Sequence, residues 1–531
     1  MLSFSNLPPE ILLKIVSLLE LHDVARIRQS CKRLQVISQD RSVWDALLAK
    51  QRLKYPVPPW LNPASSSSVP LSSVDLERAV LATHRVAQAW PQARPVPFRV
   101  QPRQGDMLLW LEIFIDRWLL VVYAEGLAYL WDTVSDPMAP PGSLSTNSRI
   151  RICAKLVDEH ENRARWTSCA AQVSDGGEKL IVLLNMRPTT KPYCCVYEVA
   201  LKANSSFKLL TSVRLNEPEI IRTISFHDNI LLLSRGSAIN LVDISNKPSR
   251  DILVLSPYSD DLEDMWNATL ELRVFHRYVF VFKARSFEVH SLDSLLNTTQ
   301  HEITATPISQ HLFQNTTFRE VKVSNPTQPT VAVGDIFDIQ FQVFAYDVLQ
   351  GLFHYSIRFQ ALPEQPPHFT ITLPGIYPLT AQLASHYSRL LPEPDLLTPS
   401  PTPTNEARHA FRSVMNPSSR GFVSAYAVGS QGRRAVWVER IRGSTTREVH
   451  VWSRPGTTDD ETIPGEPPKE IERIPVFSIA SPDLRGESMP LFVILKLNQA
   501  EDITRCALSE SMGLIVLGNR AGELFMLDVD A

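Results

Sequence analysis

Long apolar runs are missing from this sequence of 531 residues. No stretch approaches the roughly 18 consecutive apolar residues that a membrane-spanning helix needs. The N-terminus also lacks a basic region before its first apolar stretch, and Pro8, Pro9, Glu10 and Lys14 interrupt the pattern of a signal peptide. We therefore expect a protein of the cytoplasm or the nucleus that has no membrane partner.

Cysteine is scarce, and its spacing excludes the common metal sites. The six cysteines are Cys31, Cys153, Cys169, Cys194, Cys195 and Cys506. The only close pair is adjacent, which suits neither a zinc knuckle nor a redox Cys-x-x-Cys motif. We interpret all six as reduced structural thiols, and we expect no metal-binding residues.

A large charge excess and catalytic motifs are also absent. The formal net charge is −3, so the chain lacks the electrostatic footprint of a nucleic-acid-binding protein. The sequence contains no G-x-S-x-G elbow, no phosphate-binding P-loop, no H-E-x-x-H motif and no glycine-rich dinucleotide turn. We expect no catalytic residues, no cofactor-binding residues and no cofactor.

Apolar residues, by contrast, are plentiful enough for a large core. Hydrophobic residues make up 44% of the chain and charged residues 21%, which is typical of a globular protein. The length exceeds that of one ordinary domain, so we expect several structural units.

The first fifty residues have the periodicity of helices. Pro8 and Pro9 suit the first turn of a helix, where a missing N–H costs nothing, and Glu10 complements the helix dipole there. Asp23 can cap a second helix. The apolar residues that define three predicted helices are Ile11, Leu12, Ile15, Val16 and Leu19; Val24, Ile27, Cys31 and Leu34; and Val43, Trp44, Leu47 and Leu48.

This helical unit is small and unusually apolar. Below roughly 70 residues a single core rarely supplies more than about 3–5 kcal/mol, so such a unit usually needs a partner. Its apolar residues also outnumber those that three short helices can hide from water. The excess indicates an interface with another molecule.

The same segment resembles the F-box motif. The residues that match the motif are Leu7, Pro8, Glu10, Ile11 and Leu12 at its opening, Asp23, Val24, Cys31, Lys32 and Arg33 in its middle, and Trp44 at its end. Ser30 departs from the pattern, because the family usually has an aliphatic residue there. The resemblance covers about a tenth of the chain.

The resemblance implies that this segment binds the Skp-family adaptor and, through it, a cullin. The adaptor-binding residues that it implies are Leu7, Pro8, Ile11, Leu12, Ile15, Val24, Ile27, Cys31, Leu34 and Trp44. The alternative is that these side chains only fill the core of the helical unit. We favour the core for Ile15, Ile27 and Leu34, and adaptor contact for the first four residues of the set.

A linker with its own helix follows. Residues 55–70 are rich in Pro and Ser and cannot continue a helix. A helix is predicted to begin near Ser73, with Asp75 and Glu77 in its first turn, and to end before Pro91. We therefore divide the chain into F-box helices (1–50), a linker with a connecting helix (51–97) and a β-rich substrate-binding domain (98–531).

After about residue 98 the pattern changes to short β-like runs separated by turns. A typical unit is a buried strand, a tight turn and a more amphipathic strand that ends near Asp, as in residues 118–132. Similar units recur near residues 108–132, 166–199, 220–244, 267–292, 331–359, 420–453 and 503–530. Such repetition predicts a β-propeller, because one blade cannot bury both of its faces alone.

The endings Trp131-Asp132 and Leu527-Asp528 resemble those of WD repeats, although no Gly-His dipeptide opens a unit. The predicted fold class is mainly β with a small α N-terminal module: a three-helix F-box and a linker helix, then a six- to eight-bladed propeller, with seven blades expected. A strand from residues 98–104 should complete the last blade beside Glu523–Asp528, because closure removes two exposed strand edges. A pair of β-sandwiches is the alternative.

Three functions are compatible with this organisation. The first is the substrate-recognition subunit of a Skp–cullin–F-box ubiquitin ligase, with an unidentified protein substrate held by the propeller. The second is an F-box scaffold that does not direct degradation, and the third is a propeller enzyme, for which no catalytic constellation is found. The predicted substrate-binding residues, expected to converge on one mouth of the propeller, are Arg163, Arg165, Trp166, Arg235, Arg433 and Arg434.

Overall fold

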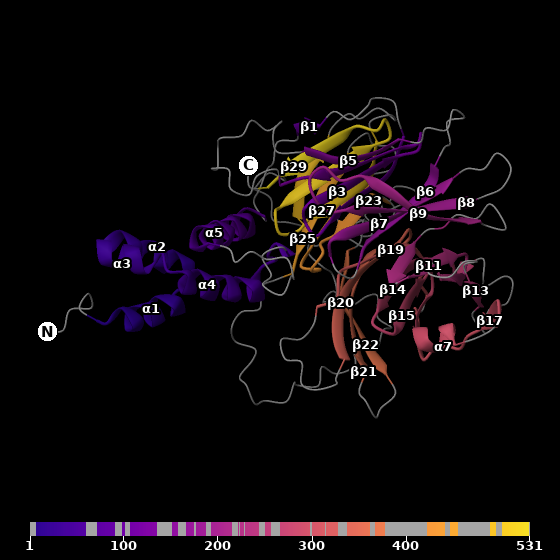
Figure 1. Cartoon of the computed structure of the whole chain (residues 1–531), viewed down its shortest axis with the longest axis horizontal. Helices are drawn as coiled ribbons and strands as arrows, with labels where there is room; N and C mark the ends of the chain where they lie inside the picture. Colours follow the sequence, from indigo (N-terminus) through magenta and orange to yellow (C-terminus); the bar gives the residue numbers. More distant parts are fainter. Residues whose placement is uncertain are drawn as a thin grey trace, which may run out of the picture.

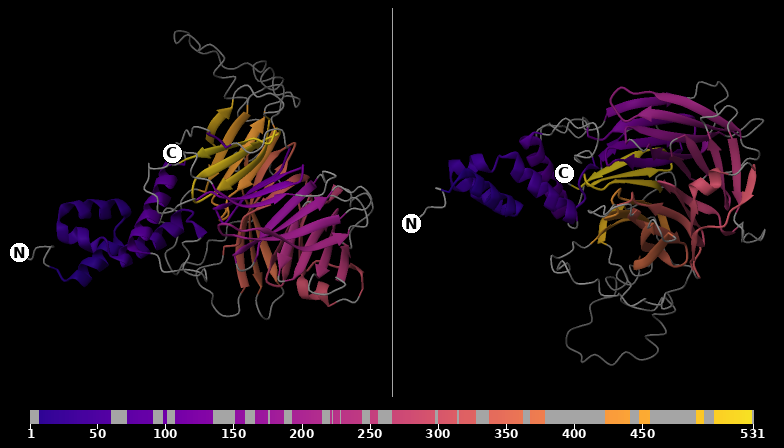
Figure 2. Two further views of the ribbon diagram at one scale, coloured as in Figure 1. Left: turned by 45° about the horizontal axis from the view of Figure 1, so that its top comes forward. Right: turned by 60° about the horizontal axis from the view of Figure 1, so that its bottom comes forward.

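A helical module projects from one side of a β-propeller (Figure 1). The structure is a computed structural model. It describes residues 7–59, 72–90, 98–100, 107–134, 151–157, 166–174, 177–186, 193–214, 221, 223–227, 229–243, 250–255, 266–297, 300–313, 315–327, 337–361, 367–377, 422–440, 447–454, 489–494 and 502–529. Figure 2 shows the same arrangement in two further views, with the helices beside the sheets in both.

The helical module contains four helices before the linker. They are α1 (Pro9–Leu18), α2 (Leu21–Ser30), α3 (Lys32–Ile37) and α4 (Arg41–Lys54). The second predicted helix is thus two helices, because Cys31 is extended, with φ −160° and ψ 158°. The hydroxyl of Ser30 donates to the carbonyl of Ile27 at 2.7 Å and so competes with the helical backbone at this break.

The linker helix, α5 (Ser73–Ala89), begins where the sequence predicted. The Ser72 hydroxyl accepts from the N–H of Asp75, and the Asp75 carboxylate accepts from the N–H of Ser72. This reciprocal pair is a capping box, which satisfies two of the N–H groups that a helix start leaves without partners. The local sequence therefore fixes the first residue of α5.

Seven sheets follow, and each is called a blade. Blade 1 contains β2 (Leu108–Phe114), β3 (Trp118–Tyr123), β4 (Leu127–Asp132) and β5 (Arg151–Val157). Blade 2 contains β6 (Trp166–Val173), β7 (Lys179–Met186), β8 (Tyr193–Ala200) and β9 (Phe207–Arg214). Blade 3 contains β10 (Ile224–His227), β11 (Ile230–Arg235), β12 (Ala238–Asp243), β13 (Arg250–Leu255) and β17 (Glu302–Thr304).

The remaining four blades complete the chain. Blade 4 contains β14 (Thr269–Phe275), β15 (Tyr278–Lys283), β16 (Ser286–Ser291) and β18 (Ser309–Leu312), with α7 (Leu292–Leu296) after β16. Blade 5 contains β19 (Phe318–Val323), β20 (Phe337–Asp347), β21 (Gly351–Ala361) and β22 (His368–Tyr377). Blade 6 contains β23 (Phe422–Val428), β24 (Arg434–Arg440), β25 (Arg447–Ser453) and β26 (Met489–Ile494); blade 7 contains β27 (Ile503–Ser509), β28 (Leu514–Asn519), β29 (Leu524–Asp528) and β1 (Phe98–Val100).

The blades form a closed ring. The first strand of each blade contacts the first strand of the next, and β27 of blade 7 contacts β2 of blade 1. β1 pairs antiparallel with β29, so that Phe98 lies opposite Met526 and Val100 opposite Leu524. The closing strand is therefore confirmed, and the ring of contacts excludes the alternative of two β-sandwiches.

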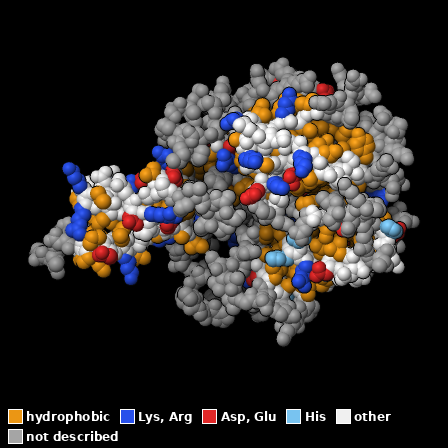
Figure 3. All heavy atoms as spheres, in the orientation of Figure 1, with side chains coloured by type: hydrophobic (Ala, Val, Ile, Leu, Met, Phe, Trp, Pro, Cys, Tyr) orange, Lys and Arg blue, Asp and Glu red, His pale blue; other side chains and the backbone are white. Residues whose placement is uncertain are grey.

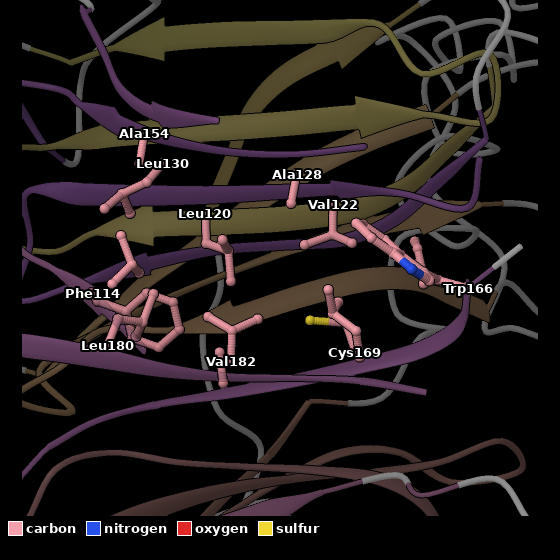
Figure 4. Packing of buried hydrophobic residues seen from close by; sticks show 14 of the residues in the cluster. Phe114, Leu120, Val122, Ala128, Leu130, Ala154, Trp166, Cys169, Leu180 and Val182 are labelled. Carbon is pink, nitrogen blue, oxygen red and sulfur yellow. The ribbon is translucent and has the colours of Figure 1, made fainter. Parts of the chain in front are cut away.

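Apolar side chains fill the space between every two neighbouring blades. Between blades 1 and 2, Leu120 and Val122 of β3 face Leu180 and Val182 of β7 (Figure 4). Comparable clusters lie at the other six blade boundaries. Because a middle strand packs against a neighbour on both of its faces, it is apolar throughout, and all six residues of β3 are buried.

The predicted units coincide with the blades but miss strands at their edges. The first unit ends at Asp132 and omits β5, and the fifth begins after β19. Blade 3 also gains β17, which pairs parallel with β13 although it follows the third strand of blade 4 in sequence. These edge strands are half-exposed or short, so their apolar signal is weaker than that of the middle strands.

Candidate interaction surfaces

Helix α1 is apolar on two of its faces. Leu12 and Val16 are fully buried in the core of the helical module. Ile11, Ile15 and Leu18 repeat at the same helical spacing on a neighbouring face. Ile11 is 47% exposed and Leu18 71%, while Ile15 is half-buried. These three side chains are called the α1 strip, and they face away from the core.

Further apolar groups are exposed on the same module (Figure 3). Leu7 is half-buried and Pro8 is exposed just before α1, and Arg33 donates from Nη2 to the Leu7 carbonyl at 2.8 Å. That bond ties the segment before α1 to α3. Cys31 is exposed, and Val36 of α3 is 68% exposed. The module therefore presents more apolar surface than the α1 strip alone.

The predicted adaptor-binding residues fall into two groups. The exposed or half-buried ones are Leu7, Pro8, Ile11, Ile15, Ile27 and Cys31. The buried ones, packed in the core of the module, are Leu12, Val24, Leu34 and Trp44. Leu12 is thus a correction, because it is fully buried in the core of the module, where α1 packs against α3 and α4, and not at the surface where we expected it.

Sequence reasoning missed two of the most exposed apolar side chains of the module. Leu18 follows Ile11 and Ile15 at helical spacing, and this periodicity was the available signal. Val36 lies in the short α3, whose start at Lys32 depends on the break at Cys31. The break was not predicted, so the direction of Val36 was not predictable either.

Arg28 of α2 ties the module to α5. Its Nη2 donates to Oε2 of Glu77 at 3.1 Å, and its Nε donates to the Ser38 hydroxyl at 2.9 Å. The guanidinium also lies over the Trp44 ring at 5.3 Å from the centroid. Since Glu77 is in α5, these contacts fix the linker helix to the module.

The other end of α5 is fixed to the propeller. Leu76 and Val80, near its start, belong to the core of the module, whereas Trp90 packs in the cluster between blades 6 and 7. Gly513 has φ +67°, and a Cβ there would lie 2.9 Å from Cγ1 of Val86. Only glycine at position 513 allows blade 7 and α5 to approach each other this closely.

A second contact joins α4 to blade 6. In the turn between β23 and β24, Gln431 donates from Nε2 to the Val57 carbonyl at 2.6 Å. Arg433 in the same turn donates from Nη1 to the Leu53 carbonyl at 2.9 Å. Arg434 places its guanidinium 4.7 Å from the centroid of the Trp90 ring. The module is therefore attached to the propeller through both α5 and α4.

Two buried carboxylates support this junction. Glu510 accepts through Oε2 from the N–H of Gln431 at 2.6 Å and through Oε1 from the N–H of Arg433. Asp116 accepts from the N–H groups of Glu510 and Ser511, each at 3.1 Å. Burial raises the pKa of both carboxyls, and for Glu510, with the Asp116 charge beside it, to about 7. The turns of blades 1, 6 and 7 thus meet under the helical module.

The module defines two faces of the propeller. It contacts turns that join the first and second strands of a blade, and the side that carries these turns is called the near face. Because successive strands of a blade are antiparallel, the turns between second and third strands, and the connections from blade to blade, lie on the opposite side. That side is called the far face.

The four predicted substrate-binding residues that the structure describes do not form one site. Arg163 and Arg165 lie outside the described residues. Trp166 is 3% exposed and packs between blades 1 and 2, and Arg434 is 4% exposed. Arg433 lies on the near face, where it binds α4. Arg235 ends the second strand of blade 3 and so lies on the far face.

The expectation of convergence was therefore wrong, for a physical reason. Arg433 and Arg434 are engaged by residues about 380 and 340 positions away in sequence, which no local pattern reveals.

The first strands of all seven blades surround a central channel. Its cavity of about 70 Å³ is smaller than the roughly 300 Å³ or more of typical ligand pockets. Inside it, Nη2 of Arg273 lies 3.2 Å from Oε1 of Glu271, and Nζ of Lys322 lies over the Trp110 ring at 5.1 Å. Burial raises the pKa of Glu112. The channel is a narrow polar space of mixed charge.

The described residues contain neither a metal-binding cluster nor a membrane-spanning helix. In that part of the chain, no group of three or more His, Cys, Asp or Glu side chains is arranged to hold a metal ion. No helix among the same residues is long and apolar enough to span a bilayer. The geometry that distinguishes the molecule is therefore that of its surfaces and of the junction between its two parts.

Comparison with known proteins gives one family match and similar solved structures. Residues 4–49 match the F-box-like family. No curated protein matches the chain. Among solved structures, the chain is similar to the C-terminal WD40 domain of Sif2, with 8% identity and a TM-score of 0.37, over 82% of this chain and 99% of that one. It is also similar to the WD40 β-propeller domain of Doa1, with 9% identity and a TM-score of 0.36, over 82% and 96% of the two chains.

The chain therefore contains an F-box-like domain followed by a seven-bladed β-propeller. The propeller assignment rests on the order of its strands and on the closed ring of contacts between its blades. This combination indicates an adaptor for protein interaction.

Proposed function

We propose that this protein is the substrate-recognition subunit of a Skp–cullin–F-box ubiquitin ligase. The helical module binds the Skp-family adaptor, and the propeller holds a target protein. The observation that carries the proposal is the α1 strip, an exposed apolar surface within the F-box-like domain. In this role the protein is non-catalytic, and other subunits supply the chemistry of ubiquitin transfer.

The α1 strip has the properties of a protein interface. Exposed apolar side chains that are grouped on one face, and are not scattered singly, indicate an interaction site. Ile11 and Leu18 are well exposed, and the half-buried Ile15 lies between them along the helix. We propose direct adaptor contact for the α1 strip, Leu7, Pro8, Ile27 and Cys31. Leu12, Val24, Leu34 and Trp44 support that surface from below.

The junction supports the second half of the proposal. α5 is anchored to the module at Glu77 and to blades 6 and 7 at Trp90, and α4 is held by Gln431 and Arg433. A target bound to such a propeller keeps one position relative to the adaptor, since the two parts cannot pivot about a single contact. A substrate receptor needs this property, because ubiquitin must reach the target across a defined gap.

Co-expression with a Skp-family adaptor and a cullin tests the proposal. The variant Ile11→Asp with Leu18→Asp places two charges in the α1 strip and should abolish co-purification of both partners. Val74→Asp is the matched control, because Val74 is 52% exposed on α5, away from the strip, and both partners should then be retained. Thermal melting checks that each variant is folded.

Two results would contradict the proposal in different ways. Equal adaptor binding by the double variant would remove the α1 strip from the interface. Retention of the adaptor without the cullin by the unaltered chain would indicate a scaffold that does not direct degradation, because both functions use the same helical module.

A further inference from the structure

We infer that the far face of blades 4 and 5 carries a docking surface for an acidic, apolar segment of a target protein. This inference rests on the proposed function and names the surface that performs its second half. The surface consists of four turns, at residues 266–268, 284–286, 312–317 and 347–351, and is called the blade 4–5 surface. Residue 314 lies outside the described residues.

All four turns lie on the same face. The segment 266–268 precedes the first strand of blade 4, and 284–286 joins the second and third strands of that blade. The segment 312–317 leads from the last strand of blade 4 to blade 5, and 347–351 joins the second and third strands of blade 5. Each is therefore on the far face, and the helical module does not cover it.

The blade 4–5 surface exposes large apolar side chains. Trp266 is 57% exposed, Leu312 62%, Val348 42% and Leu349 73%. Aromatic side chains are enriched at interface hot spots, and grouped apolar side chains are uncommon on surfaces without a partner. Other large apolar side chains of the propeller are exposed as well, for instance Ile152 and Leu209, so the distinguishing property of this surface is that four of them lie in adjoining turns.

Hydrogen bonds join the four turns in series. The Arg285 N–H donates to Oδ1 of Asn267 at 2.9 Å, and the Arg285 carbonyl accepts from the N–H of Phe313 at 2.8 Å. The N–H of Thr317 then donates to Oδ2 of Asp347 at 2.9 Å, and Oδ1 of Asp347 accepts from the N–H of Leu349 at 2.7 Å. The exposed side chains are thus held by connected backbone, which lowers the entropy lost when a partner binds.

An aromatic layer supports the surface from below. The Phe313 ring lies 5.0 Å from that of Phe318 and 5.3 Å from that of Tyr355, measured between centroids. Phe318 and Tyr355 are buried in the cluster between blades 4 and 5. Phe313 follows Leu312 directly, so the turn that carries Leu312 is anchored in the core.

The charges at this surface select the partner. Arg285 is exposed, and its Nε donates to the Thr317 hydroxyl at 3.1 Å, which orients the guanidinium across the turn. Arg319, one residue into β19, is exposed as well. Asp347 is 4% exposed, and backbone N–H groups occupy both of its oxygens. Among the described residues next to these turns, Glu320 is an exposed acid, and its Oε1 lies 3.8 Å from Nζ of Lys322.

Arg285 and Arg319 therefore place two exposed guanidinium groups beside the apolar side chains of this surface. Carboxylates on the partner can form charge-assisted hydrogen bonds with the guanidinium groups. Its apolar side chains can pack on Trp266 and Leu349. The partner that fits the blade 4–5 surface is an extended segment of a target protein in which acidic residues alternate with leucine or aromatic residues.

Selection of a random 12-residue peptide library against the full chain tests the inference. Enriched peptides should combine acidic with aromatic or leucine residues. Synthetic copies should bind Arg285→Glu and Leu349→Asp variants at least about tenfold more weakly than the unaltered chain, as expected for hot-spot residues. Arg520→Glu is the matched control, an exposed arginine in the β28–β29 turn on the same face, and it should leave binding unchanged.

The outcomes separate this inference from the proposed function. A library that yields no binder, or binders that ignore both Arg285→Glu and Leu349→Asp, would overturn the blade 4–5 surface. Adaptor binding is measured on the same preparations, and it depends on the α1 strip and not on this surface. If the adaptor fails to bind while the peptides bind as expected, the proposed ligase role is wrong and the docking surface stands.

Discussion

The propeller and the helical module bury their apolar residues in opposite ways. Each blade has a neighbour on both sides, and seven apolar clusters fill the seven boundaries between blades in the described part of the chain. The helical module has a single core, in which Leu12 and Val16 are enclosed but Ile11 and Leu18 are not. The closed ring buries the apolar faces of its blades against one another, whereas the single core of the module leaves the α1 strip exposed for a partner.

The difference has a consequence for where mutations act. In the propeller, apolar residues matter for folding, and closure of the ring makes the blades depend on one another. In the module, neighbouring residues of one helix have separate tasks, since Leu12 stabilises the fold and Ile11 is available for binding. Three predictions sharpen this comparison, from the largest expected effect to the smallest.

Removal of residues 520–531 should abolish soluble protein. The deletion removes β29, whose Leu524 and Met526 are fully buried at the boundary between blades 7 and 1. It also leaves β1 without its partner and exposes the edge of β28, and open strand edges promote aggregation. Solubility after expression is the measurement. A soluble truncation that melts cooperatively would show that the propeller does not depend on closure.

Leu12→Ala and Ile11→Ala should differ although the residues are adjacent. Leu12 is fully buried, so its truncation should lower the free energy of unfolding of the module by about 2–5 kcal/mol. Ile11 is 47% exposed, and its truncation should change that free energy by no more than about 0.5 kcal/mol. Urea denaturation of both variants provides the comparison, and equal losses would mean that α1 has no division between core and surface.

Glu510→Gln should flatten the dependence of stability on pH. Burial raises the pKa of Glu510 from its ordinary value of 4.5 to about 7, so its contribution is fully present below pH 4.5 and is lost as the pH rises through about 7. One such group gives a slope of at most about 1.4 kcal/mol per pH unit in this window. The neighbouring Asp116, Arg433 and Arg434 stay unchanged in the variant.

Thermal melting between pH 4.5 and 8 measures this effect. The melting temperature of the unaltered chain should fall with rising pH more steeply than that of Glu510→Gln. Glu125→Gln, at an exposed position in the β3–β4 turn, is the control and should keep the original slope. Parallel curves for Glu510→Gln and the unaltered chain would show that Glu510 is ionised throughout this range.

The fold was largely predictable from the sequence. Middle strands with long apolar runs, such as β3 and β7, recur in most units, although β20 of blade 5 contains several polar residues. The capping box of α5 is likewise a local signal. The break at Cys31 and the parallel pairing of β17 with β13 were not predictable, because each depends on packing against distant residues.

The candidate sites were less predictable than the fold. The F-box pattern pointed to α1, but it did not indicate which apolar face of that helix the core would take. Arg434 was expected at an open surface, yet its guanidinium packs on Trp90, more than 300 residues earlier in the chain. Trp266 and Leu349 are exposed because of how turns from two blades meet. That arrangement cannot be inferred from the residue types alone.

Calorimetric titration of a purified Skp-family adaptor into the full chain tests the central claim, that the module buries its exposed α1 strip against a partner. Burial of apolar surface on binding gives a negative heat-capacity change, so the binding enthalpy should become more favourable as the temperature rises. Ile11→Asp with Leu18→Asp should eliminate the binding heat. Binding with no heat-capacity change, or binding that persists in the double variant, would contradict the account.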